Sequence, residues 1–290
     1  MEKYIEKAKI LIEALPYIKQ FNSKIVVIKY GGSAMVDDRI KDTVIEDIVL
    51  MKLVGLKPVI VHGGGKEISD MLTSLGKKSE FVNGLRVTDQ ETVEVVEMVL
   101  SGKINKGIVQ LIQNHDLNAV GISGKDGKTL KVVKKEMDGV DIGFVGEIKE
   151  VDTKLILSLL DHDFIPVIAP LGTDSSGQTY NINADYAASA IAGALKAEKL
   201  LFLTDVEGVL TDVADKTSLI SKLTLKEVEE KMASGIISGG MIPKVDCCVE
   251  GIKAGVKNVH ILDGRVEHCM LLEIFTQKGI GTMFGEKFED

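Results

Sequence analysis

Two glycine-rich stretches beside charged residues are the part of the sequence best suited to chemistry. Lys29–Ser33 reads KYGGS and His62–Glu67 reads HGGGKE, and each follows an apolar run and precedes a helical pattern. Glycines at such a turn let successive backbone N–H groups surround an anion, and the positive end of the following helix adds to the attraction. A tight strand-to-helix turn would explain either stretch alone. Two of them on consecutive strands favour a phosphate-binding site.

Two lysines stand where they could act on that phosphate. Lys29 ends a buried strand, where a lysine is costly unless its ammonium group meets an anion or reaches water. Lys244 follows the glycine pair of SGGMIPK near the start of a helix. A solvated helix surface would explain Lys244 alone. Together the two lysines would hold a transferring phosphoryl group from both sides, and such electrostatic stabilisation is the main demand of phosphoryl transfer.

Polar residues alternate in YNINAD, which runs into an alanine-rich helix. In an extended chain the side chains of Asn181, Asn183 and Asp185 would point the same way. The alternative is that Asn183 or Asp185 caps the helix. Three polar groups in register at the end of a strand predict a site as well as a cap.

Other nucleotide-binding classes lack their signatures here. No G-x-x-x-x-G-K-[ST] motif occurs, and GIGTMFG is not followed by the helix that a dinucleotide site requires. The 290 residues include 43 acidic and 35 basic ones, so a net charge of −8 argues against general affinity for nucleic acid or anionic membranes.

The three cysteines and the apolar runs predict where the protein works. Cys247, Cys248 and Cys269 form no C-x-x-C or histidine cluster, which favours core thiols in a reducing compartment over a disulfide framework or metal site. No apolar run reaches the roughly 20 residues of a membrane span, and the first residues lack a signal-peptide core. These observations predict a cytoplasmic protein, and no metal ligand is assigned.

Short β-rich runs alternate with helical patterns along most of the chain. The runs are continuously apolar, as expected for parallel strands covered by helices on both faces, so we predict an α/β fold with a mainly parallel sheet. Residues 79–88 carry a hairpin signal, Asn-Gly, and residues 129–152 predict further antiparallel strands. Residues 1–20 carry an amphipathic helical stripe. Strands are predicted at 24–30, 58–62, 118–123, 164–170, 199–205 and 258–263, with helices near 38–55 and 66–75.

Six stretches taken together resemble one family. They read VIKYGGSAM, VHGGGKEI, NGLRVTD, YNINADYAA, FLTDVEGV and SGGMIPK. On these motifs the chain resembles the amino acid kinase family from about Lys24 onward, and within it the members that phosphorylate N-acetyl-L-glutamate with ATP and Mg²⁺. The resemblance implies a three-layer αβα sandwich of the carbamate kinase-like type. It also implies an N-terminal helix at 1–22, an amino-acid lobe at 23–195 and an ATP lobe at 196–290.

The resemblance further implies a role for each matching residue. Lys29 and Lys244 match the two lysines that stabilise the transition state, and Asp185 matches the aspartate that organises them. Arg86 matches the arginine that grips the α-carboxylate of the substrate. The remaining positions match substrate contacts (Gly64, Gly65, Asn181 and Asn183) and the ATP site (Gly31, Gly32, Thr204, Asp205 and Gly208).

Both ends of the chain resemble the members of the family that L-arginine inhibits. In those enzymes an N-terminal helix interlaces dimers into a homohexamer, and arginine binds beside that helix. Tyr17, His268, Glu273 and Gly279 match the arginine-contacting positions, and the carboxylate of Glu273 would pair with the guanidinium. The alternative is that His268 and Glu273 are polar positions on a surface helix.

Two other functions stay open at this stage. The chain could be a kinase of the same fold for another small acid, or a catalytically silent protein that senses arginine. The presence of Lys29, Asp185 and Lys244 speaks against a silent protein. Whether a PII-type signalling protein binds the chain is not decided by the sequence.

Overall fold

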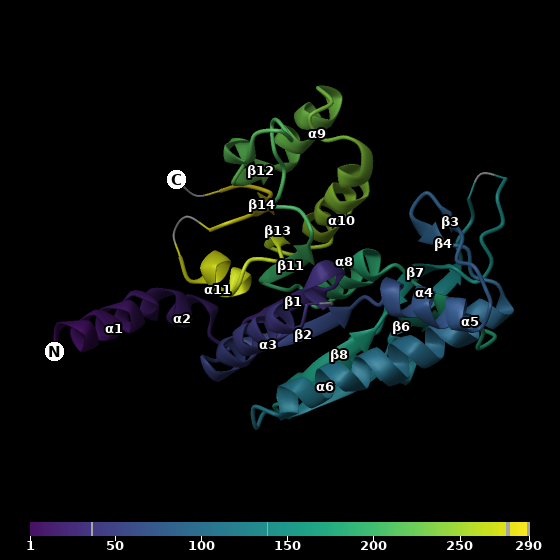
Figure 1. Cartoon of the computed structure of the whole chain (residues 1–290), viewed down its shortest axis with the longest axis horizontal. Coiled ribbons are helices and arrows are strands. Elements are labelled where there is room, and N and C mark those ends of the chain that lie inside the picture. The colour runs from purple at the N-terminus through teal and green to yellow at the C-terminus, as the bar shows by residue number, and fades with distance from the viewer. Residues whose placement is uncertain (36, 138, 277–278, 289–290) are drawn as a thin grey trace.

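A central sheet of eight strands runs through the molecule (Figure 1). This computed structural model describes residues 1–35, 37–137, 139–276 and 279–288. The strand order is β12-β14-β13-β11-β1-β2-β8-β5, and every neighbouring pair is parallel except β13 with β14. The predicted mainly parallel sheet is confirmed. The strands are β1 (Ile25–Tyr30), β2 (Lys57–His62), β5 (Ala119–Ser123), β8 (Ile165–Ala169), β11 (Lys199–Thr204), β12 (Lys222–Thr224), β13 (Asn258–Asp263) and β14 (Thr282–Gly285).

The apolar runs of the sequence form strands of the main sheet for a simple reason. All six residues of β11 and the last five of β1, β2 and β13 are buried, because helices cover both faces of the sheet. All six predicted strands are present. The strands β12 and β14 were missed, since KLT and TMFG are too short to form an apolar run.

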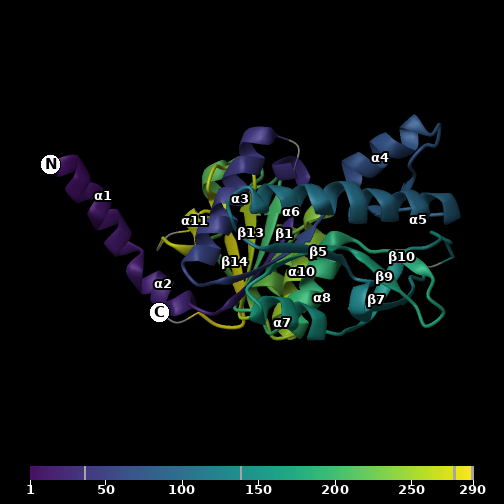
Figure 2. The ribbon, with the colours of Figure 1, turned by 90° about the horizontal axis from the view of Figure 1, so that it is seen from below.

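Helices lie on both faces of the sheet and make the predicted three layers (Figure 2). The helices α3, α4, α5, α6 and α11 share one apolar cluster with the sheet, and α7, α8, α9 and α10 share the other. A π-helical segment, η2 (Met98–Ile104), joins α5 to α6. The helices are α3 (Asp38–Leu53), α4 (Gly65–Ser74), α5 (Gln90–Glu97), α6 (Asn105–Gln113), α7 (Lys154–Asp161), α8 (Ala184–Ala194), α9 (Leu225–Ala233), α10 (Ile242–Lys253) and α11 (Cys269–Ile274).

Two small sheets stand beyond one end of the main sheet. One has the order β10-β9-β6-β7, and the other is the hairpin β3-β4, which turns at Asn83 and Gly84 with φ values of 48° and 78°. Both predicted antiparallel stretches are therefore confirmed. The strands are β3 (Phe81–Val82), β4 (Leu85–Arg86), β6 (Leu130–Lys134), β7 (Gly146–Val151), β9 (Leu171–Thr173) and β10 (Thr179–Asn181).

The N-terminal stripe forms two consecutive helices, α1 (Glu2–Glu13) and α2 (Leu15–Phe21). The first, purple in Figure 2, projects away from the body, and Ile10 and Leu11 on it are 65% and 73% exposed. The second packs against the main body, where Phe21 is buried. Among the described residues, no helix is both long and apolar enough to cross a membrane.

The three cysteines are free thiols inside the core, as predicted. Cys247 and Cys248 lie in α10, and Cys269 begins α11. Burial raises the pKa of Cys247 and of Cys269 to about 12, so both stay protonated at neutral pH. Their role is packing.

Burial in the two clusters predicts a matched pair of stability changes. Val59 on β2 is fully buried, whereas Val213 is 84% exposed. Val59→Ala should lower the free energy of unfolding by about 2 kcal/mol, because it removes buried apolar surface and leaves a cavity. Val213→Ala should change it by less than about 0.5 kcal/mol. Urea unfolding measures both, and equal effects would contradict the burial pattern.

Candidate active site

A cavity of about 200 Å³ opens at the carboxyl ends of β1 and β2. This edge is where open α/β sheets bind ligands. Its walls come from β1, the second glycine loop, the β3-β4 hairpin, β10 and the start of α8. It contains many of the residues singled out in the sequence: Lys29, Gly64, Gly65, Arg86, Asn181, Asn183 and Asp185.

The two lysines and the aspartate form one charged row. Lys29 Nζ lies 3.0 Å from Asp185 Oδ1, and Lys244 Nζ lies 3.5 Å from Asp185 Oδ2. Burial raises the pKa of Asp185, but the two ammonium groups outweigh burial and hold the pKa below its usual value. The carboxylate is therefore ionised at neutral pH and keeps the two cations together at the edge of the cavity.

The first glycine loop leaves space for the Lys29 side chain. A methyl group on Gly31 would lie 2.6 Å from Lys29 Nζ, so only glycine lets the ammonium fold back over its own loop. A second cavity, of about 450 Å³, lies between this loop and the next, and Gly32, Gly64, Gly65 and Asp205 line it. Because Gly64 and Gly65 line both cavities, the second glycine loop forms the wall between them.

Arg86 is a buried guanidinium with part of its bonding capacity unused. It donates to Ser79 Oγ at 2.5 Å, to Ser69 Oγ at 2.9 Å and to the Gly65 carbonyl at 2.8 Å. It also lies 4.7 Å from the ring centroid of Phe81. Burial lowers the pKa of Arg86 from its ordinary value, which is far above neutrality, so it stays charged. Within the described residues three of its five N–H donors are used, both on Nη2 and one on Nη1, so Nε–H and one Nη1–H are left, and each can donate a single bond to a carboxylate.

The alternating polar residues do not all lie on one extended segment. Helix α8 begins at Ala184, so Asp185 is already helical and the expected register holds only as far as Asn183. Asn183 caps the helix, because its Oδ1 accepts from the N–H of Asp185 at 2.8 Å. Asn181 donates to Thr88 Oγ1 at 3.3 Å. Both asparagines line the cavity and could also contact a ligand.

The residues matched to the ATP site lie around the end of β11. Thr204 is buried, and its Oγ1 accepts from the Val206 N–H at 3.1 Å. Asp205 lines the second cavity. Gly208 packs close to Thr282, where a methyl group would lie 2.5 Å from Oγ1. Asp205 therefore faces the space between the glycine loops, whereas Thr204 and Gly208 shape the turn beside it.

Two of the four residues matched to the arginine site lie together. The side chain of Glu273 is only 6% exposed, and its Oε2 accepts from the N–H groups of Ile280 and Gly281 at 2.7 and 3.2 Å, beside Gly279. The surface-helix alternative is therefore wrong for Glu273, because its side chain turns inward. Tyr17 on α2 packs against the main apolar cluster.

His268 is partly exposed and bonds to a different carboxylate. Its Nδ1 lies 2.7 Å from Oδ1 of Asp47, which is fully buried in α3. This bond raises the pKa of His268, and burial raises the pKa of Asp47 to about 6. The pair joins α3 to the start of α11.

Sequence reasoning missed a buried row that ends at Glu273. Lys199 Nζ lies 3.0 Å from His260 Nε2, and His260 Nδ1 lies 2.7 Å from Glu273 Oε1. Burial lowers the pKa of Lys199 to about 8 and that of His260 to about 4. The Lys199 ammonium also lies 5.2 Å from the ring centroid of Phe21, at the end of α2. The sequence offered one signal for this row, because Lys199 and His260 belong to the otherwise apolar runs KLLFLTD and NVHILD.

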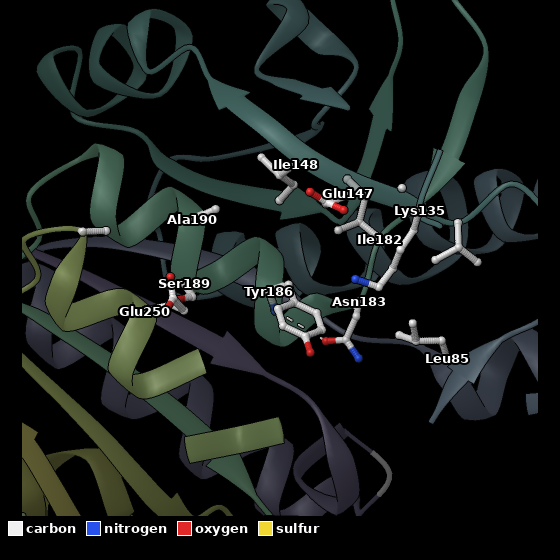
Figure 3. Close-up of a pocket in the computed structure, with 13 residues that line it drawn as sticks. Leu85, Lys135, Glu147, Ile148, Ile182, Asn183, Tyr186, Ser189, Ala190 and Glu250 are labelled. Atoms are coloured by element: carbon white, nitrogen blue, oxygen red, sulfur yellow. Dashed lines mark hydrogen bonds between the residues drawn. The ribbon is translucent and has the colours of Figure 1, made fainter. Parts of the chain in front are cut away.

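A third cavity, of about 320 Å³, adjoins the first (Figure 3). The two share Leu85, Val145, Ile182 and Asn183, and Figure 3 shows the side chains of Lys135 and Tyr186 close to Asn183. Lys135 Nζ lies 5.6 Å from the Tyr186 ring centroid. Among the described residues, no group of three or more His, Cys, Asp or Glu side chains is arranged to hold a metal ion.

The fold and this site together define a kinase of small molecules. The chain belongs to the amino acid kinase family, whose model, described as "Amino acid kinase family", matches residues 24–263.

Named relatives show which members of the family this chain closely resembles in sequence and length. Acetylglutamate kinase of Caldanaerobacter subterraneus subsp. tengcongensis is 60% identical over 287 residues, which cover 99% of this chain and 96% of that protein. Acetylglutamate kinase of Thermoanaerobacter pseudethanolicus is 58% identical with the same coverage. The solved structure of N-acetylglutamate synthase from Neisseria gonorrhoeae, with coenzyme A and N-acetyl-glutamate, is 25% identical with a TM-score of 0.85. The match covers 97% of this chain but only 64% of the synthase chain.

The charged row predicts how stability depends on pH. The pKa of Asp185 is lower in the folded protein than in the unfolded chain, so the stabilisation is present above about pH 4 and is lost as the pH falls through the folded value. Asp185→Asn should lower the free energy of unfolding by about 1–3 kcal/mol at pH 7, and by less below pH 4. Asp70→Asn, at an exposed ion pair with Lys66, should change it by less than about 0.5 kcal/mol. If the difference in the free energy of unfolding between the parent protein and Asp185→Asn grew as the pH fell, the expected pH dependence would be wrong.

Proposed function

We propose that this chain phosphorylates N-acetyl-L-glutamate with ATP, giving N-acetyl-L-glutamyl 5-phosphate and ADP, the second step of arginine synthesis. The observation that carries the proposal is the row of Lys29, Asp185 and Lys244 at the edge of one cavity, with a second cavity across the glycine loop. The names of the full-length relatives support the substrate. We place this activity in the cytoplasm.

The reaction requires neutralisation of charge more than it requires an acid or base catalyst. The γ-carboxylate of the substrate is ionised at neutral pH, so no general base is required. An electron pair of its oxygen forms the new bond to the γ-phosphorus, while the bond from that phosphorus to the β–γ bridging oxygen breaks and its electron pair leaves on that oxygen with ADP. Lys29, Lys244 and the N–H groups of the glycine loops offset the repulsion between the two anions.

The two cavities supply a place for each substrate. The smaller one offers Arg86 for the α-carboxylate and Asn181 and Asn183 for polar contacts, so we assign it to N-acetyl-L-glutamate. The other lies beside Asp205 and the end of β11, so we assign it to the phosphates of ATP. Mg²⁺ enters with the nucleotide, whose phosphate oxygens and water are its preferred ligands. We correspondingly assign 23–195 to the amino acid and 196–290 to ATP.

Acyl phosphate formation tests the proposal directly. The purified full chain is incubated with ATP and Mg²⁺, and the product is trapped as a hydroxamate. N-acetyl-L-glutamate, L-glutamate and L-aspartate are compared. A signal from N-acetyl-L-glutamate alone supports the proposal. A signal from another acid would keep the kinase and change the substrate, and no signal from any acid would favour a silent arginine sensor.

The guanidinium geometry predicts a selective defect in Arg86→Lys. Lysine keeps the charge but has a single donor nitrogen, so it cannot hold Gly65, Ser69 and Ser79 and also donate to a carboxylate. We expect the KM for N-acetyl-L-glutamate to rise at least about tenfold, with kcat within about threefold. Arg39→Lys, whose side chain is 87% exposed, is the matched control and should leave KM unchanged. An unchanged KM in Arg86→Lys would remove Arg86 from the substrate site.

We further propose that L-arginine inhibits the enzyme and that α1 assembles dimers into a hexamer. Support comes from the exposed apolar residues of α1 and from the contact between Phe21 and Lys199, since Lys199 is linked through His260 to Glu273. Tyr17, His268 and Gly279 complete the assigned arginine site. The contacts from Phe21 through Lys199 and His260 to Glu273 thus join α2 to the part of the assigned site at Glu273 and Gly279.

Removal of residues 1–20 tests this regulation. We expect the truncated chain to lose both the hexamer, measured by light scattering, and inhibition by arginine, while keeping its kcat. Leu11→Glu should act in the same way, because it places a charge on the exposed apolar face, which is 73% exposed at this residue. Glu13→Gln on the same helix should change neither property. A truncated chain that stays hexameric and arginine-sensitive would overturn the assignment.

A further inference from the structure

A buried polar network lies directly behind the second glycine loop. His62 ends β2, Asn105 begins α6 and Lys106 follows it, and the side chains of His62 and Asn105 are fully buried. None of the three residues has a role in the site described so far. A fully buried polar side chain destabilises the fold unless its donors and acceptors find hydrogen-bond partners, so the geometry of such a network is tightly constrained.

Lys106 fixes the orientation of the Asn105 amide. Lys106 Nζ lies 2.7 Å from the Gly121 carbonyl oxygen and 3.1 Å from Asn105 Oδ1. An ammonium group only donates, so the atom of Asn105 that faces it must be the oxygen. The amide nitrogen then faces the other way, 2.9 Å from the Val167 carbonyl oxygen and 3.2 Å from both the Ile122 carbonyl oxygen and His62 Nε2.

The amide in turn fixes the tautomer of His62. An amide nitrogen donates and does not accept, so the His62 Nε2 that faces it carries no proton, and the proton of the neutral ring is on Nδ1. Nδ1 lies 2.8 Å from the Gly63 carbonyl oxygen and donates to it. Burial lowers the pKa of His62 to about 4, so the ring is neutral at physiological pH and this tautomer makes both bonds.

The bond from His62 sets the direction of one peptide in the glycine loop. The Gly63 N–H donates to the Tyr30 carbonyl at 2.7 Å, so both polar groups of Gly63 are held. The described chain contains no cis peptide, and a trans peptide points its C=O and N–H in opposite directions. The Gly64 N–H therefore points away from the His62 ring. Within the described residues it has no protein acceptor, and Gly64 lines both cavities.

The π-helical segment holds the same loop from its other side. A methyl group on Gly64 would lie 2.3 Å from Ile104 Cδ1 and 2.7 Å from Leu100 Cδ2, both in η2. Asn105 comes directly after this segment. The wider π-turn thus brings apolar side chains against Gly64 and Asn105 against His62. The loop is fixed at two points, which leaves its peptide little freedom to rotate.

We propose that His62, held in one tautomer by Asn105, is a positioning residue that aims the Gly64 N–H at the phosphoryl group as it passes between the two cavities. The proposal rests on the proposed function, because it needs phosphoryl transfer across this wall. A preorganised N–H donor stabilises the developing charge on the phosphoryl oxygens without having to reorient during the reaction. His62 itself touches no substrate.

Two variants separate the two bonds of the ring. The amide nitrogen of His62→Asn reaches about the place of Nδ1 and can still donate to Gly63. The amide of His62→Gln reaches about the place of Nε2, so it keeps the contact with Asn105 and loses the bond to Gly63. We expect His62→Gln to lower kcat roughly 10- to 100-fold with little change in KM, and His62→Asn to stay within about threefold of the parent kcat. If the two variants lost kcat equally per folded molecule, or if His62→Asn lost more than His62→Gln, the proposal would be overturned.

A spectroscopic measurement tests the tautomer in the unaltered protein. The ¹⁵N resonances of the five histidine rings are recorded at pH 7, and His62 is assigned in the unaltered protein by through-bond correlation of its ring with its own backbone. We expect a protonated Nδ1 and an unprotonated Nε2, and the opposite pattern would refute the proposal even if both variants fail to fold. If the parent protein does not phosphorylate N-acetyl-L-glutamate, the proposed function fails separately, and the kinetic comparison is made with the acid that it does use.

Discussion

The salt-bridged row of Lys29, Asp185 and Lys244 is the interaction on which the rest of the site depends. Each residue comes from a different element, namely β1, α8 and α10, so the row exists only when all three are packed together. One carboxylate holds two ammonium groups that would otherwise repel each other, and the group as a whole carries a single positive charge. Such a site attracts an anion and still keeps its lysines in place before the anion arrives.

Polar residues inside the central sheet follow one rule throughout this molecule. Lys29 in β1, His62 in β2, and Lys199 and His260 in β11 and β13 all lie among apolar neighbours covered by helices. Because none of these residues is more than 8% exposed, each needs a protein partner for its polar group. Among the described residues, every buried side-chain nitrogen and oxygen has a hydrogen-bond partner. The same strands therefore supply the core and the fixed points of the functional networks.

The sequence predicts the long-range architecture better than it predicts these networks. Continuous apolar runs located six strands, since burial on both faces leaves a signal in every residue of a strand. By contrast, the partner of His62 lies 43 residues away, and no local pattern indicates that Asn105 faces it. Glu273 shows the same limit, because a polar residue on a short helix is typical of a surface, and only its bonds to His260 and to the Ile280 N–H turn it inward. The helix cap at Asn183 was predictable, since capping depends on residues next to each other in the chain.

The position of β14 in the sheet sets an order for assembly during synthesis. The strands β1, β2, β5 and β8 all lie within residues 25–169, so this half of the sheet can pair soon after those residues leave the ribosome. In the other half, β14 at residues 282–285 is hydrogen-bonded between β12 and β13, which are made earlier. Until β14 is inserted, those two strands have an open edge between them, which is the kind of surface that chaperones shield from aggregation. The half of the molecule assigned to ATP is thus the last to close.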